Sequence, residues 1–253
     1  MMKVMAVANQ KGGVGKTTTS VNLSAGLANI GKKVLLIDTD PQGNATSGIG
    51  IEKSEVSECI YDVLINEVPL QEIIHKTSIE LLDIAPTTIA LAGAEIELVS
   101  TISREARLRN AIATIKSDYD YVIIDCPPSL GLLTLNALTA ADAVLIPVQC
   151  EYYALEGLSQ LLSTITLVQK HLNADLAIDG VLLTMFDSRT NLSNQVAVEV
   201  KKYFKEKVYN TVIPRSVRLS EAPSHGTSIF EYDPKSKGAQ VYLQFAEEVS
   251  LNG

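Results

Sequence analysis

Short apolar runs recur along the chain and are separated by longer segments with a helical pattern. The runs cover residues 4–8, 34–37, 81–84, 121–124, 143–148, 178–183 and 208–213. Runs that are this short, rich in β-branched residues and mostly apolar are typical of strands buried on both faces of a sheet. Their alternation with helices predicts an α/β fold, with a mainly parallel twisted sheet flanked by helices.

Helical periodicity is clearest over residues 21–30, 155–172, 194–205 and 238–249. Residues 57–74 and 89–115 predict two helical insertions, and the second is interrupted near residues 99–103. No internal repeat, low-complexity tract or Pro/Gly/Ser-rich linker divides the sequence. We therefore expect one domain over residues 1–253.

Composition favours a cytoplasmic protein with one large core. The chain has 253 residues, of which 46% are hydrophobic, and this suffices for a core without cross-links. Cys59, Cys126 and Cys150 form neither a C-x-x-C pair nor a metal-ligand spacing, which argues against disulfides and zinc and for a reducing compartment. We expect no signal peptide, because the first predicted strand begins within three residues of the N-terminus, and no membrane contact, because no apolar run approaches the length of a membrane span.

Charge is distributed unevenly along the chain. Residues 1–179 hold 12 Lys and Arg against 21 Asp and Glu, a net charge of −9, whereas residues 187–237 hold 9 against 6, a net charge of +3. An acidic body with one basic edge is compatible with DNA binding in spite of the overall charge of −8. The alternative is that these charges only solvate helix faces.

A glycine-rich loop at residues 9–19 joins the first predicted strand to the first helix. It departs from the usual phosphate-binding pattern G-x-x-x-x-G-K-[ST], because Gln10 replaces the first glycine and Lys11 adds a second lysine. In such a loop the backbone N–H groups cradle phosphates, Lys16 reaches the β- and γ-phosphates, and the Thr17 hydroxyl coordinates Mg²⁺. The predicted nucleotide contacts are Lys11, Gly12, Gly13, Val14, Gly15, Lys16, Thr17 and Thr18.

One lysine is enough to bind a single nucleotide, so Lys11 has another use. From the entry to the loop its side chain can reach the phosphates of a second subunit across a face-to-face homodimer. The alternative, a glycine-rich turn with no ligand, leaves both lysines unexplained.

Three aspartates follow strand ends, where ligands of parallel sheets bind. Asp38 and Asp40 follow the run 34–37, and Asp125 follows the run 121–124 and precedes a Pro-Pro turn. Asp125 is a Walker-B-type carboxylate that typically holds Mg²⁺ through a water molecule. A carboxylate near the γ-phosphate can orient the attacking water, and the alternative for Asp38 or Asp40 is a turn cap.

Taken together, the loop and the segments 38–44 and 124–129 resemble the ParA family of partition ATPases. Residues 150–157 and 213–224 match its chromosomal branch, and the likeness runs essentially end to end. The resemblance implies ATP as cofactor, Asp40 as the residue that positions the water, and an Mg²⁺-linked structural role for Asp38. It also implies adenine contacts near Met185, Pro214 and Ser216. Catalysis would then rest on Lys11, Lys16 and Asp40.

Six cations in the basic segment are candidate DNA contacts. These are Arg189, Lys201, Lys202, Lys205, Arg215 and Arg218, with surface salt bridges as the alternative. Phosphate contacts need no base-reading element, and we find no helix-turn-helix or zinc-finger signature, so we expect nonspecific binding of double-stranded DNA.

The resemblance implies an ATP-bound homodimer on the nucleoid, whose hydrolysis is stimulated by a ParB-type centromere-binding protein. Alternatives are a related ATPase that positions another cargo, an ATP-dependent metabolic ligase, and a scaffold with a structural nucleotide. The absence of an Asn-Lys-x-Asp motif favours ATP over GTP. The final helix lacks the cationic face of a membrane-binding tail, which argues against a MinD-like membrane role. Cys126 lacks the second cysteine that iron–sulfur relatives need.

Overall fold

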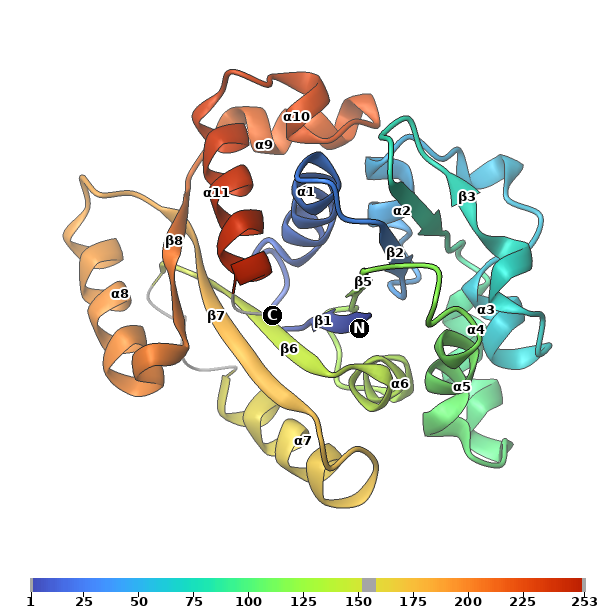
Figure 1. The fold of residues 1–253 in the computed structure, drawn as a ribbon. Helices are drawn as coiled ribbons and strands as arrows, with labels where there is room; N and C mark the ends of the chain where they lie inside the picture. The colour runs from blue at the N-terminus through green and yellow to red at the C-terminus, as the bar shows by residue number, and fades with distance from the viewer. Residues whose placement is uncertain (1, 152–157, 252–253) are drawn as a thin grey trace.

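Eight strands form one sheet in the order β3-β4-β2-β5-β1-β6-β7-β8 in the computed structural model, which describes residues 2–151 and 158–251 (Figure 1). The strands are β1 Lys3–Val7, β2 Val34–Asp38, β3 His75–Lys76, β4 Leu82–Ala85, β5 Tyr121–Asp125, β6 Ala143–Gln149, β7 Ala177–Phe186 and β8 Val208–Pro214. All neighbours pair in parallel except β3 with β4. The predicted α/β class and the mainly parallel sheet are therefore confirmed.

Helices cover both faces of this sheet. They are α1 Lys16–Asn29, α2 Asn44–Gly48, α3 Ile60–Ile65, α4 Leu91–Glu97, α5 Arg107–Ala113, α6 Leu132–Ala140, α7 Leu158–His171, α8 Asn191–Phe204, α9 Val217–Glu221, α10 Ile229–Tyr232 and α11 Lys237–Leu251. Figure 1 shows α1 and α11 on one face and α6 and α7 on the other. None of the helices in the described part of the chain is long and apolar enough to span a membrane.

Strand β5 shows why successive positions of a predicted run can all be apolar. Val122 and Ile124 pack into the core beneath α6 and α7, whereas Tyr121 and Ile123 pack into the core beneath α1 and α11. Successive side chains of a strand point to opposite faces, so a strand covered on both sides buries all of them.

The predicted insertions are more broken than expected. A continuous helical pattern over 57–74 is wrong, because α3 ends at Ile65, Glu67 adopts a left-handed φ of 58°, and only a 3₁₀ turn follows at Leu70–Ile73. Pro69 also lacks the N–H that a continuing helix would use. The interruption predicted near 99–103 is confirmed, since Ser103 is left-handed with a φ of 55° and separates α4 from α5.

Several elements had no prediction, namely α2, α6, α9, α10 and the short strand β3. Residues 152–157 lie outside the described residues. They include most of the stretch 150–157 that resembles the ParA family and the first three residues of the predicted helix 155–172.

Strand register gathers the candidate site at one edge. Asp125 lies opposite Val7 of β1 on one side and opposite Asp38 of β2 on the other. The glycine-rich loop and both aspartate segments therefore meet at the carboxyl ends of the strands. The opposite, amino edge carries the start of β1 at Lys3 and the end of α11 at Leu251, and Figure 1 marks both chain ends close together.

Helix α1 packs closely on α11 at Gly26. A Cβ atom added there would lie 2.9 Å from the Cβ of Ala246 and 3.2 Å from the carbonyl oxygen of Tyr242. The absence of a side chain thus sets the separation of the two helices that cover one face of the sheet.

We expect Gly26→Val to lower the free energy of unfolding by about 1–3 kcal/mol, the usual cost of overpacking. The control is Gly93→Ala on the outer side of α4, where the nearest atom is the flexible Glu97 carboxylate at 3.1 Å. This control should be neutral or stabilising by up to about 1 kcal/mol. Urea unfolding measures both, and wild-type stability of Gly26→Val would contradict the close packing of α1 on α11.

Candidate functional site

The glycine-rich loop leads directly into the N-terminus of α1. Gly13 and Gly15 have φ values of 73° and 86°, a left-handed conformation that side-chain-bearing residues rarely adopt. Gly15 caps α1 without any side-chain hydrogen bond, so backbone N–H groups of the first turn are left for a ligand. Such a helix start is suited to bind an anion.

These residues line a cleft of about 340 Å³ at the carboxyl edge of the sheet. The cleft brings most of the predicted loop residues together with Asp40 and Met185. Its walls are Gly12, Gly13, Gly15, Lys16, Thr17, Thr18, Asp40, Gln42, Asn44, Pro128 and Met185. Val14 is buried behind the loop, and its carbonyl oxygen accepts a hydrogen bond of 2.8 Å from Thr184 Oγ1.

The two loop lysines have different surroundings. Lys16 is 7% exposed and its Nζ donates a hydrogen bond of 3.1 Å to the Lys11 carbonyl oxygen. Burial lowers the pKa of Lys16, and the charge of Asp125 opposes this effect. Lys11 is half-buried and forms no ion pair with the described residues. Lys16 therefore faces the cleft carboxylates, while Lys11 has no such partner in the described parts.

Asp125 is the carboxylate that ties the loop helix to the sheet. It is fully buried, and its two oxygens accept hydrogen bonds of 2.8 Å from the hydroxyls of Thr17 and Ser20. Burial raises the pKa of Asp125 to about 8, and the neighbouring charge of Asp38 acts in the same direction. A divalent cation would favour the ionised carboxylate, and hydroxyl and carboxylate oxygens are the ligands that Mg²⁺ prefers. The donor set thus fits magnesium.

Asp38 holds the turn that follows β2. Its Oδ2 accepts hydrogen bonds of 2.8 Å from both the backbone N–H and the hydroxyl of Thr46, and its Oδ1 accepts one of 3.1 Å from the Asp40 N–H. Burial raises the pKa of Asp38 to about 6. Both oxygens are engaged in local hydrogen bonds, as the turn-cap alternative requires. The Asp40 carboxylate accepts one hydrogen bond from the described residues, of 3.0 Å from the Gln42 N–H, and Asp40 lines the cleft.

A smaller cavity of about 80 Å³ adjoins the cleft. It shares the lining residues Gly15, Thr18 and Met185 with the cleft, so the two spaces are neighbours. The predicted adenine contacts Met185, Pro214 and Ser216 all line it, together with Thr184, Ile213, Arg215, Leu219, Ser220 and Tyr242. Met185 has a left-handed φ of 51°, and such strained residues concentrate at ligand sites.

Sequence patterns missed several of these residues. Ser20 lies four residues after Lys16, on the same side of α1, and this spacing was the available signal. Thr46 and Tyr242 had no such signal in the sequence, because only the folding of the chain brings them to the site. The Tyr242 hydroxyl lies 3.2 Å from Thr19 Oγ1 and joins α11 to the loop helix.

The three candidate arginines lie at the carboxyl edge, after β7 and β8 and on α9. They are well exposed, with side-chain fractions of 87%, 59% and 56% for Arg189, Arg215 and Arg218. Each is also paired with an acidic side chain, as the salt-bridge alternative expects. The pairs are Arg189 with Asp187 (2.7 Å), Arg215 with Glu151 (3.0 Å), and Arg218 with Glu221 (3.1 Å) and Asp233 (3.5 Å).

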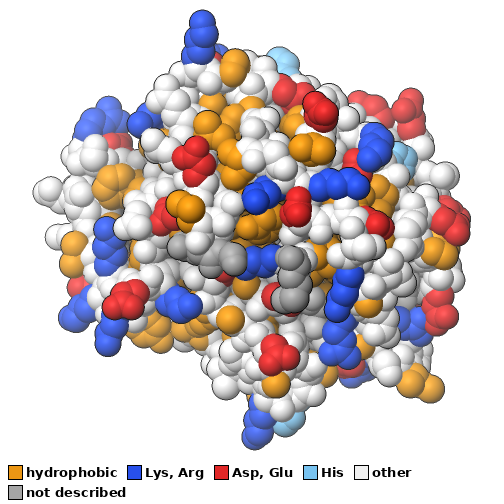
Figure 2. All heavy atoms as spheres, in the orientation of Figure 1, with side chains coloured by type: hydrophobic (Ala, Val, Ile, Leu, Met, Phe, Trp, Pro, Cys, Tyr) orange, Lys and Arg blue, Asp and Glu red, His pale blue; other side chains and the backbone are white. Residues whose placement is uncertain are grey.

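The candidate lysines lie elsewhere. Lys201 and Lys202 occupy the last turn of α8 and Lys205 follows it, all exposed, and Figure 2 shows several Lys and Arg side chains gathered at the left over α8. Helix α8 begins near Arg189 at the carboxyl edge and runs about 20 Å toward the amino edge. The arginines and lysines therefore lie near opposite edges of the sheet.

The hydroxyl of Thr46 provides a test of the turn geometry. It donates to Asp38 and accepts a hydrogen bond of 3.0 Å from the Thr87 N–H, all in a buried position. Replacement by the isosteric Val leaves the buried Thr87 N–H unpaired and removes one of the two donors to Asp38 Oδ2, so Thr46→Val should lower the free energy of unfolding by about 1–3 kcal/mol. In urea unfolding, the exposed Thr114→Val should change it by less than about 0.5 kcal/mol. Equal changes in Thr46→Val and Thr114→Val would show that the buried hydrogen bonds of Thr46 add nothing to the free energy of unfolding.

Comparisons with known proteins agree with this geometry. Residues 2–178 match the family described as AAA domain. The chain is 69% identical over 253 residues to the sporulation initiation inhibitor protein Soj of Bacillus subtilis, with 100% of both proteins covered. It is 56% identical to the chromosome partitioning protein ParA of Myxococcus xanthus, covering 98% of this chain and 87% of that protein.

Among solved structures, cobyrinic acid a,c-diamide synthase from Mycobacterium smegmatis with bound ADP and magnesium is 42% identical and has a TM-score of 0.87. The match covers 98% of this chain and 93% of that one. The similarity to the partition proteins extends over nearly the whole chain, and it agrees with the family match and with the P-loop cleft at the carboxyl edge. The chain therefore belongs to the Soj/ParA family of chromosome-partitioning ATPases.

Proposed function

We propose that the protein is an ATP-dependent dimerising switch. Two copies bind ATP and Mg²⁺ and join face to face, and the dimer then binds nonspecific double-stranded DNA. A ParB-type centromere-binding protein stimulates hydrolysis and so releases the dimer from the nucleoid. The observation that carries this proposal is the cleft at the carboxyl edge, where Lys16, Thr17 and Asp40 line one space beside a smaller cavity that the predicted adenine contacts line.

Each residue at the cleft has a separate role in ATP binding or hydrolysis. Lys16 neutralises the β- and γ-phosphates, while Thr17 and Asp125 hold Mg²⁺, which supplies positive charge to the leaving phosphate oxygens. Asp40 orients the attacking water, because its carboxylate faces the cleft and bonds only one backbone N–H. Asp38 fixes the turn that carries Asp40. Lys11, which has no ionic partner in the described parts, contacts the phosphates of the other subunit.

Arg189, Arg215 and Arg218 form the DNA contact. They lie at the edge where the nucleotide binds, so dimerisation through that edge places two sets of arginines in one assembly. Lys201, Lys202 and Lys205 extend the contact where the duplex runs along α8. We place the protein in the cytoplasm, at the nucleoid, acting as a single ATPase domain.

A second candidate is an ATP-dependent amide ligase, favoured by the name of the M. smegmatis structure, which has also been solved with an ATP analogue and magnesium. ATP turnover separates the two functions. A switch should turn over ATP faster with DNA and the ParB-type partner together and should not respond to cobyrinic acid. Stimulation by cobyrinic acid alone would replace the proposed function by the ligase.

We expect Lys16→Ala to lose ATP binding, because the loop then lacks its charge-assisted contact to the phosphates. Lys11→Ala should bind ATP as a monomer but lose ATP-dependent dimerisation and hydrolysis. Calorimetry measures the binding and sedimentation measures the dimer. Wild-type ATP affinity in Lys16→Ala would refute the phosphate site, and a normal dimer in Lys11→Ala would refute the contact between subunits.

We expect Arg189→Glu to lose DNA binding and to keep the ATP-dependent dimer. If each subunit neutralises roughly four phosphates, the log-affinity of the wild-type dimer should fall with log-salt at a slope of about −7, and loss of one arginine pair should flatten this slope by about 2. The control is Lys116→Glu, an exposed residue beyond α5. Anisotropy with a random-sequence duplex measures both, and a wild-type slope in Arg189→Glu would place the DNA contact elsewhere.

A further inference from the structure

Asp187 accepts more hydrogen bonds from Arg189 than the described acidic residues accept from Arg215 or Arg218. Arg189 Nε donates to Oδ1 at 2.9 Å and Nη2 donates to Oδ2 at 2.7 Å, so the guanidinium and the carboxylate form a two-pronged pair. The Arg189 backbone N–H donates to the same Oδ1 at 3.0 Å. The carboxylate thus accepts three hydrogen bonds from one residue.

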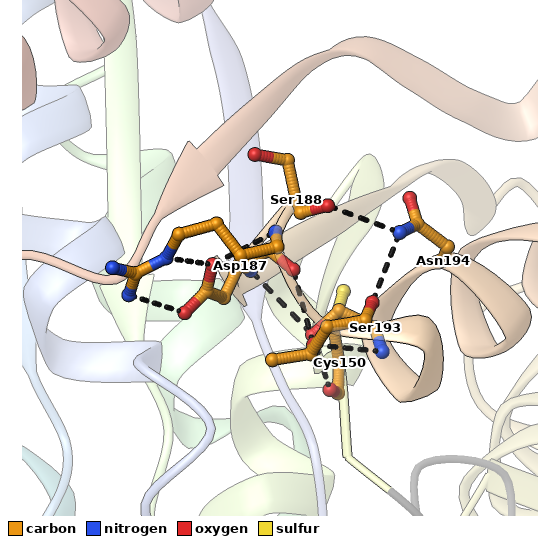
Figure 3. Close-up of polar contacts among 7 residues, drawn as sticks. Cys150, Asp187, Ser188, Ser193 and Asn194 are labelled. Atoms are coloured by element: carbon orange, nitrogen blue, oxygen red, sulfur yellow. Dashed lines mark hydrogen bonds and ion pairs between the residues drawn. The ribbon is translucent and has the colours of Figure 1, made fainter.

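The loop around this pair is anchored to the sheet (Figure 3). The Asp187 carbonyl oxygen accepts hydrogen bonds of 3.1 Å from the N–H and the hydroxyl of Thr190. Ser193 Oγ donates to the Cys150 carbonyl oxygen at 3.2 Å, and Asn194 Nδ2 donates to the Ser188 carbonyl oxygen at 3.2 Å. Asp187 is therefore fixed in place at the end of β7.

Exposure differs sharply between the two partners. The Asp187 side chain is 21% exposed, whereas that of Arg189 is 87% exposed. Arg215 is close by, because its N–H donates to the Phe186 carbonyl oxygen at 3.1 Å. Hydrogen bonds from Arg189 hold the pKa of Asp187 at about 2, and the charge of Arg215 contributes to this. The carboxylate is ionised at neutral pH and faces two of the arginines proposed to bind DNA.

A carboxylate and a phosphate offer a guanidinium the same kind of two-pronged acceptor. The Nε–Nη2 edge of Arg189 cannot pair with both acceptors, so a two-pronged contact of this edge to DNA requires it to leave Asp187. The freed carboxylate then remains beside the phosphate and must take up a cation from solution. The move of Arg189 from Asp187 to a phosphate therefore adds less binding free energy than the binding of an unpaired arginine would. The cation that Asp187 takes up cancels part of the counterion release from DNA.

We propose that Asp187 limits the affinity of this surface for DNA by competing with the phosphate backbone for Arg189. This inference rests on the proposed DNA-binding function. Because a single subunit gains little from the exchange, stable binding needs the two surfaces of the ATP-bound dimer. Asp187 thereby makes attachment to DNA depend on dimerisation.

The opposite role would be that Asp187 orients Arg189 for DNA, and one substitution separates the two roles. Asp187→Asn removes the charge and keeps an oxygen that can accept the Arg189 backbone N–H, as asparagine does in such turns. If the carboxylate competes, DNA affinity of the ATP dimer rises by at least about tenfold at 0.1 M salt, because no carboxylate beside the phosphate is left to take up a cation. If it orients, affinity falls.

Two controls accompany this variant. Asp175→Asn makes the same charge change at an exposed position beyond α7, and it should leave DNA affinity within about twofold of wild type. Arg189→Gln combined with Asp187→Asn should show no gain over Arg189→Gln alone, because the effect passes through the arginine. Sedimentation confirms that each variant forms the ATP-dependent dimer.

The outcomes separate this inference from the proposed function. Wild-type dimers that bind DNA while Asp187→Asn binds equally or more weakly would overturn the inference and leave the proposed function intact. A gain in Asp187→Asn that persists without Arg189 would also overturn it. If neither wild type nor Asp187→Asn binds DNA at low salt as a dimer, both the inference and the proposed function fail.

Discussion

The rest of the site depends on the hydrogen bonds that the buried Asp125 carboxylate accepts from α1. A fully buried carboxylate needs hydrogen-bond donors, and α1 supplies them through the hydroxyls of Thr17 and Ser20. These bonds fix the rotation of α1 against β5, and with it the direction of the N–H groups at the start of the helix. The Asp125 carbonyl oxygen also accepts a hydrogen bond of 2.6 Å from the Thr39 hydroxyl. This bond holds the segment between Asp38 and Asp40 beside Asp125.

The central strands were predictable because β1, β2, β5 and β6 are covered on both sides and so appear as nearly uninterrupted apolar runs. The helix α6 was not, since it is buried on most sides and has no polar face to mark its period. Within the site, the loop and the strand-end aspartates carry local patterns that a sequence displays. Thr46 and Tyr242 join the site from α2 and α11, and only the packing of distant segments brings them there.

Charge shows a similar limit of sequence reasoning. The excess of +3 over residues 187–237 indicates a basic edge, yet every candidate arginine there has an acidic neighbour in space. A count of charges cannot detect these pairs, because Asp187 reaches Arg189 through a turn and Asp233 reaches Arg218 from the segment that follows α10. Nor can it show that α8 carries its lysines toward the other edge of the sheet.

Both chain ends lie at the amino edge, where β1 begins at Lys3 and α11 ends at Leu251. The nucleotide cleft and the arginines occupy the opposite edge. A fluorophore, an affinity tag or a surface tether joined near either end would therefore project away from the face on which a second copy and DNA would assemble. The same arrangement makes the molecule a candidate for circular permutation, with a short linker joining the old ends and new ends opened in a surface loop.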